Sequence, residues 1–132
     1  QDAFDPERFR DQGHRLVDLL ADYLRDVKSG AGPVLPGIAP EEMLDRWDGH
    51  FPDQPDQDLL PLFKRVLAES QHLHHPRFLG HQQNAPLPFA ALSGLAAELL
   101  NNGSAVFEMG PVNTVMEKRL IQWMADRVGF GA

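Results

Sequence analysis

The chain has 132 residues, 42% of them hydrophobic, which suits one small domain or part of a larger one. Its formal net charge of −7 argues against nucleic acid as a partner, because a phosphate-binding surface needs clustered lysine and arginine. The lack of cysteine excludes disulfides and thiolate catalysis, and no apolar run approaches the ~20 residues of a membrane span, so no membrane partner is expected.

The first predicted element is a long amphipathic helix over residues 6–28. Asp5 is suited to cap it, because a short side chain with an oxygen accepts hydrogen bonds from the first free backbone N–H groups. Apolar residues follow at helical spacing, and Gly30 provides a plausible end. The three prolines of residues 30–40 then predict an extended arm, since proline interrupts a helix.

The pattern alone leaves open where this first helix packs. A long amphipathic helix on an extended arm often packs on another subunit. Packing on later helices of the same chain would explain the same apolar stripe. The spacing of the apolar residues favours neither arrangement.

Four further helices are predicted, over residues 40–47, 59–70 and 88–100 and from Pro111 onward. The helix over 88–100 carries small and apolar side chains on most sides, which predicts a buried helix with close neighbours. The Asn-Asn-Gly sequence at 101–103 ends it, because these residues tolerate a left-handed backbone. No segment shows the alternation of a strand, so the fold class is all-α with about five helices and a proline-rich connector.

Two polar, glycine-bearing loops, residues 74–85 and 101–110, flank the apolar helix over 88–100. Polar loops beside a buried helix are costly unless their backbone and side chains find partners. Loops of this kind often carry the chemistry of a protein, so each is a candidate to line a pocket. The alternative is structural: a capped loop before the helix and a tight connection after it, each satisfying its own backbone.

Four histidines cluster in the second half of the chain, at His72, His74, His75 and His81. Histidine is the commonest metal ligand, but no pair has the helical spacing of a metal site and no acid lies within the cluster. We therefore expect no metal and regard these side chains as solvated or hydrogen-bonded loop histidines. No nucleophile–base pair or glycine-rich phosphate loop is present either, so spacing alone shows no complete catalytic machine.

Three motifs of the second half are specific enough to compare with known families. They are His75-Pro76-x-Phe78-x-Gly80-His81, Leu99-Leu100-Asn101-Asn102-Gly103 and Phe107-Glu108-Met109-Gly110-Pro111, with Glu117 six residues on. Together they resemble the N-terminal region of the group II pyridoxal-phosphate-dependent decarboxylases, the family of aromatic-L-amino-acid, glutamate and tyrosine decarboxylases. The pattern from Phe9 to Leu24 resembles the first helix of that family, so the similarity covers essentially the whole chain.

The resemblance implies the N-terminal dimerisation layer of a fold-type I enzyme, a cytoplasmic carboxy-lyase of amino-acid metabolism that uses pyridoxal 5'-phosphate. In such a homodimer the N-terminal helices of the two subunits intertwine. We therefore expect residues 1–40, the first helix and the arm, to pack on a partner subunit. Residues 41–132 would form a helical segment that leads into an absent cofactor-binding domain. The first residue, Gln1, and the end just past a helix suggest a trimmed or processed piece that is inactive alone.

The resemblance also implies five substrate-side positions. His81, Gln82 and Asn84 match the loop placed over the substrate, and Gly103 and Ala105 match the loop that reaches into the partner's active site. The first loop is more polar than in animal aromatic decarboxylases, so the amino-acid substrate is left open.

No catalytic residue, cofactor ligand or metal ligand is assigned within the chain. Neither Lys64 nor Lys118 has the sequence context of the family's cofactor lysine, so the Schiff-base lysine is expected beyond this chain. The alternative to the enzyme is a non-enzymatic helical module that keeps only the dimer surface.

Overall fold

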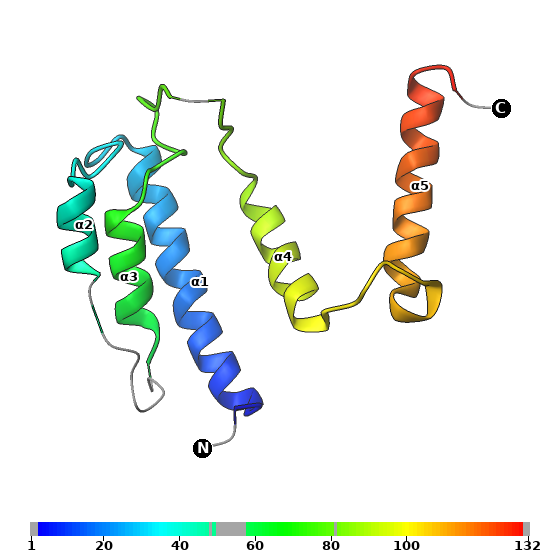
Figure 1. The fold of residues 1–132 in the computed structure, drawn as a ribbon, viewed down its shortest axis with the longest axis horizontal. Helices are drawn as coiled ribbons and strands as arrows, with labels where there is room; N and C mark the ends of the chain where they lie inside the picture. The colour runs from blue at the N-terminus through cyan, green and yellow to red at the C-terminus, as the bar shows by residue number, and fades with distance from the viewer. Residues whose placement is uncertain (1–2, 48, 50–57, 81, 131–132) are drawn as a thin grey trace. The chain divides into compact units, whose positions relative to one another are not determined.

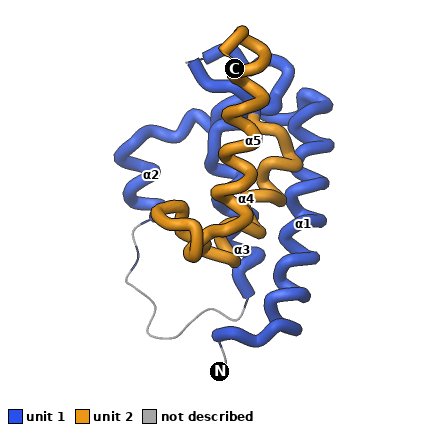
Figure 2. Tube along the Cα trace, turned by 90° about the vertical axis from the view of Figure 1, so that its right-hand side faces the viewer, with its two compact units in different colours: residues 1–85 blue, residues 86–132 orange. Residues whose placement is uncertain are grey.

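All regular structure in the described residues is helical (Figure 1), which confirms the all-α prediction. The computed structural model describes residues 3–47, 49, 58–80 and 82–130. These residues form two compact units, 1–85 and 86–132 (Figure 2). The predicted functional division, at residue 40, stays a prediction.

The first unit begins with α1 (Pro6–Lys28), a helix with the predicted bounds. The Asp5 carboxylate accepts hydrogen bonds from the backbone N–H groups of Glu7 and Arg8, at 2.9 and 3.3 Å, which caps the N-terminus. At the other end Gly30 takes a positive φ of 82°, a conformation that glycine adopts without steric cost. Local sequence therefore sets both ends of this helix.

Two shorter helices follow in the first unit, α2 (Pro40–Arg46) and α3 (Leu60–Glu69). Both lie within the predicted ranges and are one or two residues shorter, a usual difference where helix ends fray. Side chains join the end of α2 to α3: the Arg65 guanidinium lies 4.1 Å from the Trp47 ring centroid, and the Trp47 Nε1–H donates to Glu69. The cation–π contact and the hydrogen bond hold α2 beside α3.

Helix α1 packs side by side with α3 of the same chain (Figure 1). Val27 is the one buried hydrophobic residue among those described, with 4% of its surface exposed. An ion pair also joins the helices, with Arg15 Nη2 2.7 Å from Asp58 Oδ2. The intrachain packing that the pattern left open is thus present, whereas packing of residues 1–40 on a partner subunit stays a prediction.

The second unit contains α4 (Pro88–Leu100), a short 3₁₀ turn η1 (Phe107–Met109) and α5 (Pro111–Arg127). Asn101 ends α4 with a left-handed φ of 46°, as the Asn-Asn-Gly sequence predicts. The turn η1 was not predicted, because three residues are too few to show a helical period. It packs against the start of α5.

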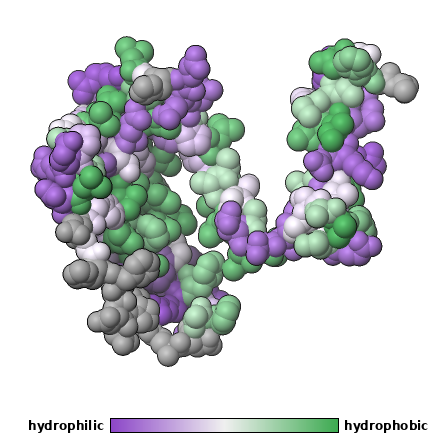
Figure 3. Space-filling model, viewed as in Figure 1, coloured by the Kyte–Doolittle hydropathy of each residue, from purple (hydrophilic) through white to green (hydrophobic). Residues whose placement is uncertain are grey.

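Helix α4 is exposed, and the prediction that it is buried is wrong for this chain. Phe89 and Leu99 are 82% and 68% exposed, and apolar side chains are visible along the helix (Figure 3). Within residues 86–130 no other helix packs against it. Composition shows that a helix needs a cover, but it does not show which surface supplies that cover.

The exposed apolar helices are not membrane spans. Among the described residues, no helix has both the length and the mean hydropathy needed to cross a bilayer.

Candidate functional site

The first candidate loop presents unpaired amide side chains. Gln82 and Asn84 are exposed, and neither makes a hydrogen bond within the described part of the chain. An amide that is not used to satisfy local backbone keeps both a donor and an acceptor for a ligand. His81 lies outside the described residues, so its prediction is untested.

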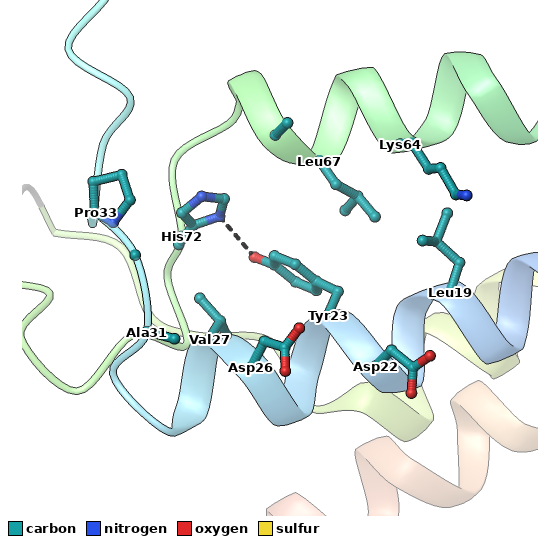
Figure 4. A pocket seen from close by; sticks show the side chains of 12 residues that line it. Leu19, Asp22, Tyr23, Asp26, Val27, Ala31, Pro33, Lys64, Leu67 and His72 are labelled. Atoms are coloured by element: carbon teal, nitrogen blue, oxygen red, sulfur yellow. Dashed lines mark hydrogen bonds between the residues drawn. The ribbon is translucent and has the colours of Figure 1, made fainter.

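The base of this loop, residues 71–78, is held against the proline-rich arm and α1. The His72 backbone N–H donates to the Val34 carbonyl at 2.9 Å. The His72 ring also meets α1, because its Nδ1 lies 3.2 Å from the Tyr23 hydroxyl (Figure 4). Three segments far apart in sequence thus meet at one imidazole.

A second buried imidazole, His75, lies beside the first. Its backbone N–H donates to the His72 carbonyl at 3.1 Å, and its Nδ1 accepts from the Arg77 backbone N–H at 3.1 Å. The proton of the neutral ring therefore belongs on Nε2, a buried atom with no hydrogen-bond partner. Burial, and then the nearby charge of His75, lower the pKa of His72 below its ordinary value.

The histidine cluster does not form a metal site in the part of the chain that the structure describes. No group of three or more metal-ligating side chains converges there. His72 and His75 are buried and hydrogen-bonded, so for these two the expectation of solvated side chains does not hold.

A half-open cavity of about 310 Å³ lies between α1, the arm and α3. Its lining is mainly apolar, with Tyr23 and His72 meeting at one end (Figure 4). Sequence reasoning missed this cavity. The one signal available was a tyrosine in the apolar stripe of the first helix, and nothing local related it to a histidine 49 positions away.

The cavity does not fit pyridoxal phosphate. A phosphate group needs cationic side chains or free backbone N–H donors, and the cofactor aldehyde needs a lysine. Lys64 lines the cavity, but so do the carboxylates Asp22 and Asp26, and no arginine, serine or threonine does. The described residues therefore provide no cofactor site of their own.

The second candidate loop, residues 101–110, is closed at its neck by two glycines. A Cβ at Gly110 would collide with the Gly103 carbonyl oxygen, and one at Gly103 would come within 2.8 Å of the Met109 Cε. The Thr114 hydroxyl donates to the Gly110 carbonyl at 2.9 Å and fixes the same neck. Glycine at 103 and 110 thus permits the close approach of two backbone segments.

The structure separates the two residues predicted in this loop by position. Gly103 is half-buried at the neck, whereas Ala105 is exposed toward the tip. Val106 and Phe107 follow Ala105 and are 51% and 56% exposed. Gln82 and Asn84 belong to the first compact unit and the two second-loop residues to the second, so each pair is described only within its own unit.

Comparisons with known proteins give one consistent result. No family model matches the chain. Tyrosine decarboxylase 2 of Arabidopsis thaliana is 26% identical over 130 residues, which cover 92% of this chain and 23% of that protein. The chain thus spans about a quarter of the length of the curated relatives it matches.

Two solved structures share the backbone arrangement. Tryptophan decarboxylase of Catharanthus roseus, in complex with L-tryptophan, is similar with a TM-score of 0.80 and 25% identity, over 96% of this chain and 27% of that one. The Oryza sativa enzyme with pyridoxal phosphate and tryptamine has a TM-score of 0.81 over the same shares, and its 22% identity supports the fold alone.

Proposed function

We propose, from the homology of this chain to the N-terminal part of plant aromatic amino-acid decarboxylases, that it is the N-terminal part of a pyridoxal-phosphate-dependent L-amino-acid decarboxylase. Such an enzyme converts an amino acid into an amine and CO2. The observation that carries the proposal is the backbone match to tryptophan decarboxylase over 96% of the chain. A homodimer and a cytoplasmic location form part of the same proposal.

The exposed apolar helices support a role in assembly. Leu92, Leu95 and Leu99 of α4 are each about half or more exposed, as are Trp123 and Met124 of α5. Apolar surface on this scale is rare on a monomer and marks a surface that another chain or domain covers. In the proposal these helices pack on the cofactor domain and on the partner subunit.

The two loops would shape the substrate pocket. In this arrangement His81, Gln82 and Asn84 lie over the substrate and orient it, and Ala105 reaches toward the partner's active site. Gly103 acts indirectly, because its place at the neck fixes the loop that carries Ala105. When bound, pyridoxal phosphate supplies the electron sink for loss of CO2, and residues outside this chain would hold it. The chain's own contribution is orientation and exclusion of water.

The proposal is tested on the full-length protein, purified with pyridoxal phosphate and supplied with L-tyrosine, L-tryptophan or L-glutamate. We expect the cofactor to bind and at least one amino acid to yield CO2 and its amine in equal amounts. The isolated 132 residues serve as a negative control and should release no CO2.

Failure of the full-length protein to bind the cofactor would overturn the proposal. The non-enzymatic dimerisation module is the alternative, and the comparisons do not favour it. An open reading frame that stops soon after Ala132 would restore that alternative, whereas several hundred further codons with a lysine in the cofactor context would exclude it.

A further inference from the structure

The two buried polar residues among those described are both histidines. His72 is 9% exposed and His75 3% exposed, and they lie three positions apart on one short segment. Burial disfavours the charged form of an imidazole, and a second imidazole close by disfavours it further. Neither side chain faces the solvent in which a loop histidine usually titrates.

These histidines join three separate parts of the first unit. Tyr23 of α1 meets the His72 ring at 3.2 Å, and the Val34 carbonyl of the arm accepts from the His72 backbone N–H at 2.9 Å. His75 then holds its own segment, accepting at Nδ1 from the Arg77 backbone N–H at 3.1 Å. We call Tyr23, His72 and His75 the histidine latch. It holds residues 71–78, directly before the first candidate loop.

The hydrogen bonds of the latch require neutral rings. A protonated imidazole carries a proton on both nitrogens and has no acceptor left. Protonated His75 would direct Nδ1–H at the Arg77 N–H, and protonated His72 could no longer accept from the Tyr23 hydroxyl. Acid therefore removes a contact at each ring while it places a charge in a buried site.

Charged groups surround the cavity next to His72 from each packed helix (Figure 4). Asp22 and Asp26 of α1 favour an imidazolium, whereas Lys64 of α3 and the neighbouring His75 oppose it. Arg77 on the latch segment directs its guanidinium to the Gly32 carbonyl at 3.4 Å. The pKa of His72 nevertheless lies below its ordinary value, so burial outweighs the two carboxylates.

We infer that the histidine latch fastens residues 71–78 to the arm and α1 only while both imidazoles are neutral, and that it opens on acidification. Because the folded state lowers the pKa of His72, the unfolded state binds the proton first as the pH falls. Stability from the latch is complete above the ordinary value of 6.5 and is lost as the pH falls below it. That opening also displaces the substrate-side loop is a consequence that rests on the proposed function.

The test is hydrogen–deuterium exchange of this chain at pH 7.5 and 5.5, read by mass spectrometry and corrected for intrinsic exchange. Peptides covering residues 71–78 should lose protection by about tenfold per titrating histidine at one pH unit below 6.5. Peptides from α5, which contains no histidine, should keep theirs and serve as the internal reference.

A double variant separates titration from packing. In His72→Asn/His75→Asn each amide oxygen replaces the Nδ1 acceptor without titrating, so protection of residues 71–78 should become independent of pH. His14→Asn is the matched control on exposed α1 surface and should retain the wild-type response. Tyr23→Phe removes the hydroxyl that favours neutral His72 and should move the opening to higher pH.

Three results would each overturn the latch: equal protection of residues 71–78 at both pH values in the wild type, a pH response that survives in the double variant, or loss of that response in His14→Asn. If the double variant does not fold, the wild-type profile and the direction of the Tyr23→Phe shift decide. The readout uses neither cofactor nor decarboxylation, so an inactive full-length protein would leave its meaning unchanged.

Discussion

At the scale of single residues, the candidate site contains two kinds of position. The first-loop amides Gln82 and Asn84 are exposed and make no bonds that folding requires. Gly103 is different, because it permits a close backbone approach that a side chain would obstruct. Substitution at the first kind of position should affect turnover, and at the second kind it should affect the shape of a loop.

Replacing His81 or Asn84 by alanine in the full-length protein should lower kcat/KM by about tenfold or more, as loss of a positioning hydrogen bond does. The thermal midpoint should change little, since Asn84 contributes no contact to the described structure. Gln83→Ala removes a neighbouring amide of the same loop and is the matched control. Equal kcat/KM in the Asn84→Ala variant and the wild type would contradict the placement over the substrate.

Removing two methyl groups from the small core should cost more than removing them from its edge. Val27 is 4% exposed and Val17, on the same helix, is 43% exposed. Val27→Ala should therefore lower the free energy of unfolding by about 1–2 kcal/mol, and Val17→Ala by less. Urea denaturation followed by circular dichroism measures both. Similar losses for the two variants would show that Val27 is not at the centre of the packing.

At the scale of elements, the contact between α1 and α3 combines one ion pair with a helix cap. Asp58 accepts from the Leu60 backbone N–H at 3.0 Å, which satisfies a free donor at the start of α3, and it also pairs with Arg15. Leu59 adds a backbone hydrogen bond to the Gln12 side chain at 3.3 Å. The start of α3 is thus fixed on α1 by polar contacts beside an apolar stripe.

The Asp58 carboxylate should make the stability of this contact depend on pH. The Leu60 N–H, and then Arg15, hold its pKa below the ordinary value of 3.8. The stabilisation is therefore complete above 3.8 and is lost as the pH falls through the lower, folded pKa. Asp58→Asn keeps the capping oxygen and removes the charge, so it should lower the thermal midpoint at neutral pH but not below about pH 3.

The control for this prediction is Asp18→Asn, the same substitution at an exposed position of α1. It should leave the midpoint unchanged at every pH. A difference between wild type and Asp58→Asn that persists in acid would assign the effect to packing instead of charge.

At the scale of the whole molecule, apolar surface predominates. The first unit has one buried hydrophobic residue among those described, whereas the apolar residues of α4 and α5 are exposed. A core this small stabilises a chain weakly, so the exposed helices are the larger reserve of hydrophobic free energy. Their burial requires a surface that the described residues do not supply.

The 132-residue chain should therefore self-associate in solution. Light scattering as a function of concentration should give an average mass well above the 14.8 kDa of one chain. Leu92→Glu places a charge on the exposed apolar surface of α4 and should reduce association, while Gln83→Glu adds the same charge outside the helices and should not. A monodisperse monomer at all concentrations would contradict this account of the surface.

Helix positions were predictable because their signals are local. Asp5 and Pro6 mark the start of α1, and Asn101 takes the left-handed conformation that ends α4. Each of these signals acts within about one turn of its helix, so neighbouring residues suffice to identify it. The three-residue turn η1 escaped prediction because it is too short to show a period.

The candidate site was predictable only in part. The two loops and their glycines stand out in the sequence, and the family resemblance assigned Gln82, Asn84, Gly103 and Ala105 to them. That Gly103 lies at a closed neck depends on its approach to Gly110, seven positions away. No pattern of composition or periodicity reports such an approach of two backbone segments.

The sequence by itself therefore determined the helices, their ends and the excess of apolar surface, since these follow from backbone preferences and composition. Only the tertiary structure decided which of the clustered histidines are buried. Tyr23 and His72 are 49 positions apart, and they meet because the arm turns the chain back over the end of α1. A contact of this kind depends on the path of the whole unit, and short-range preferences do not encode it.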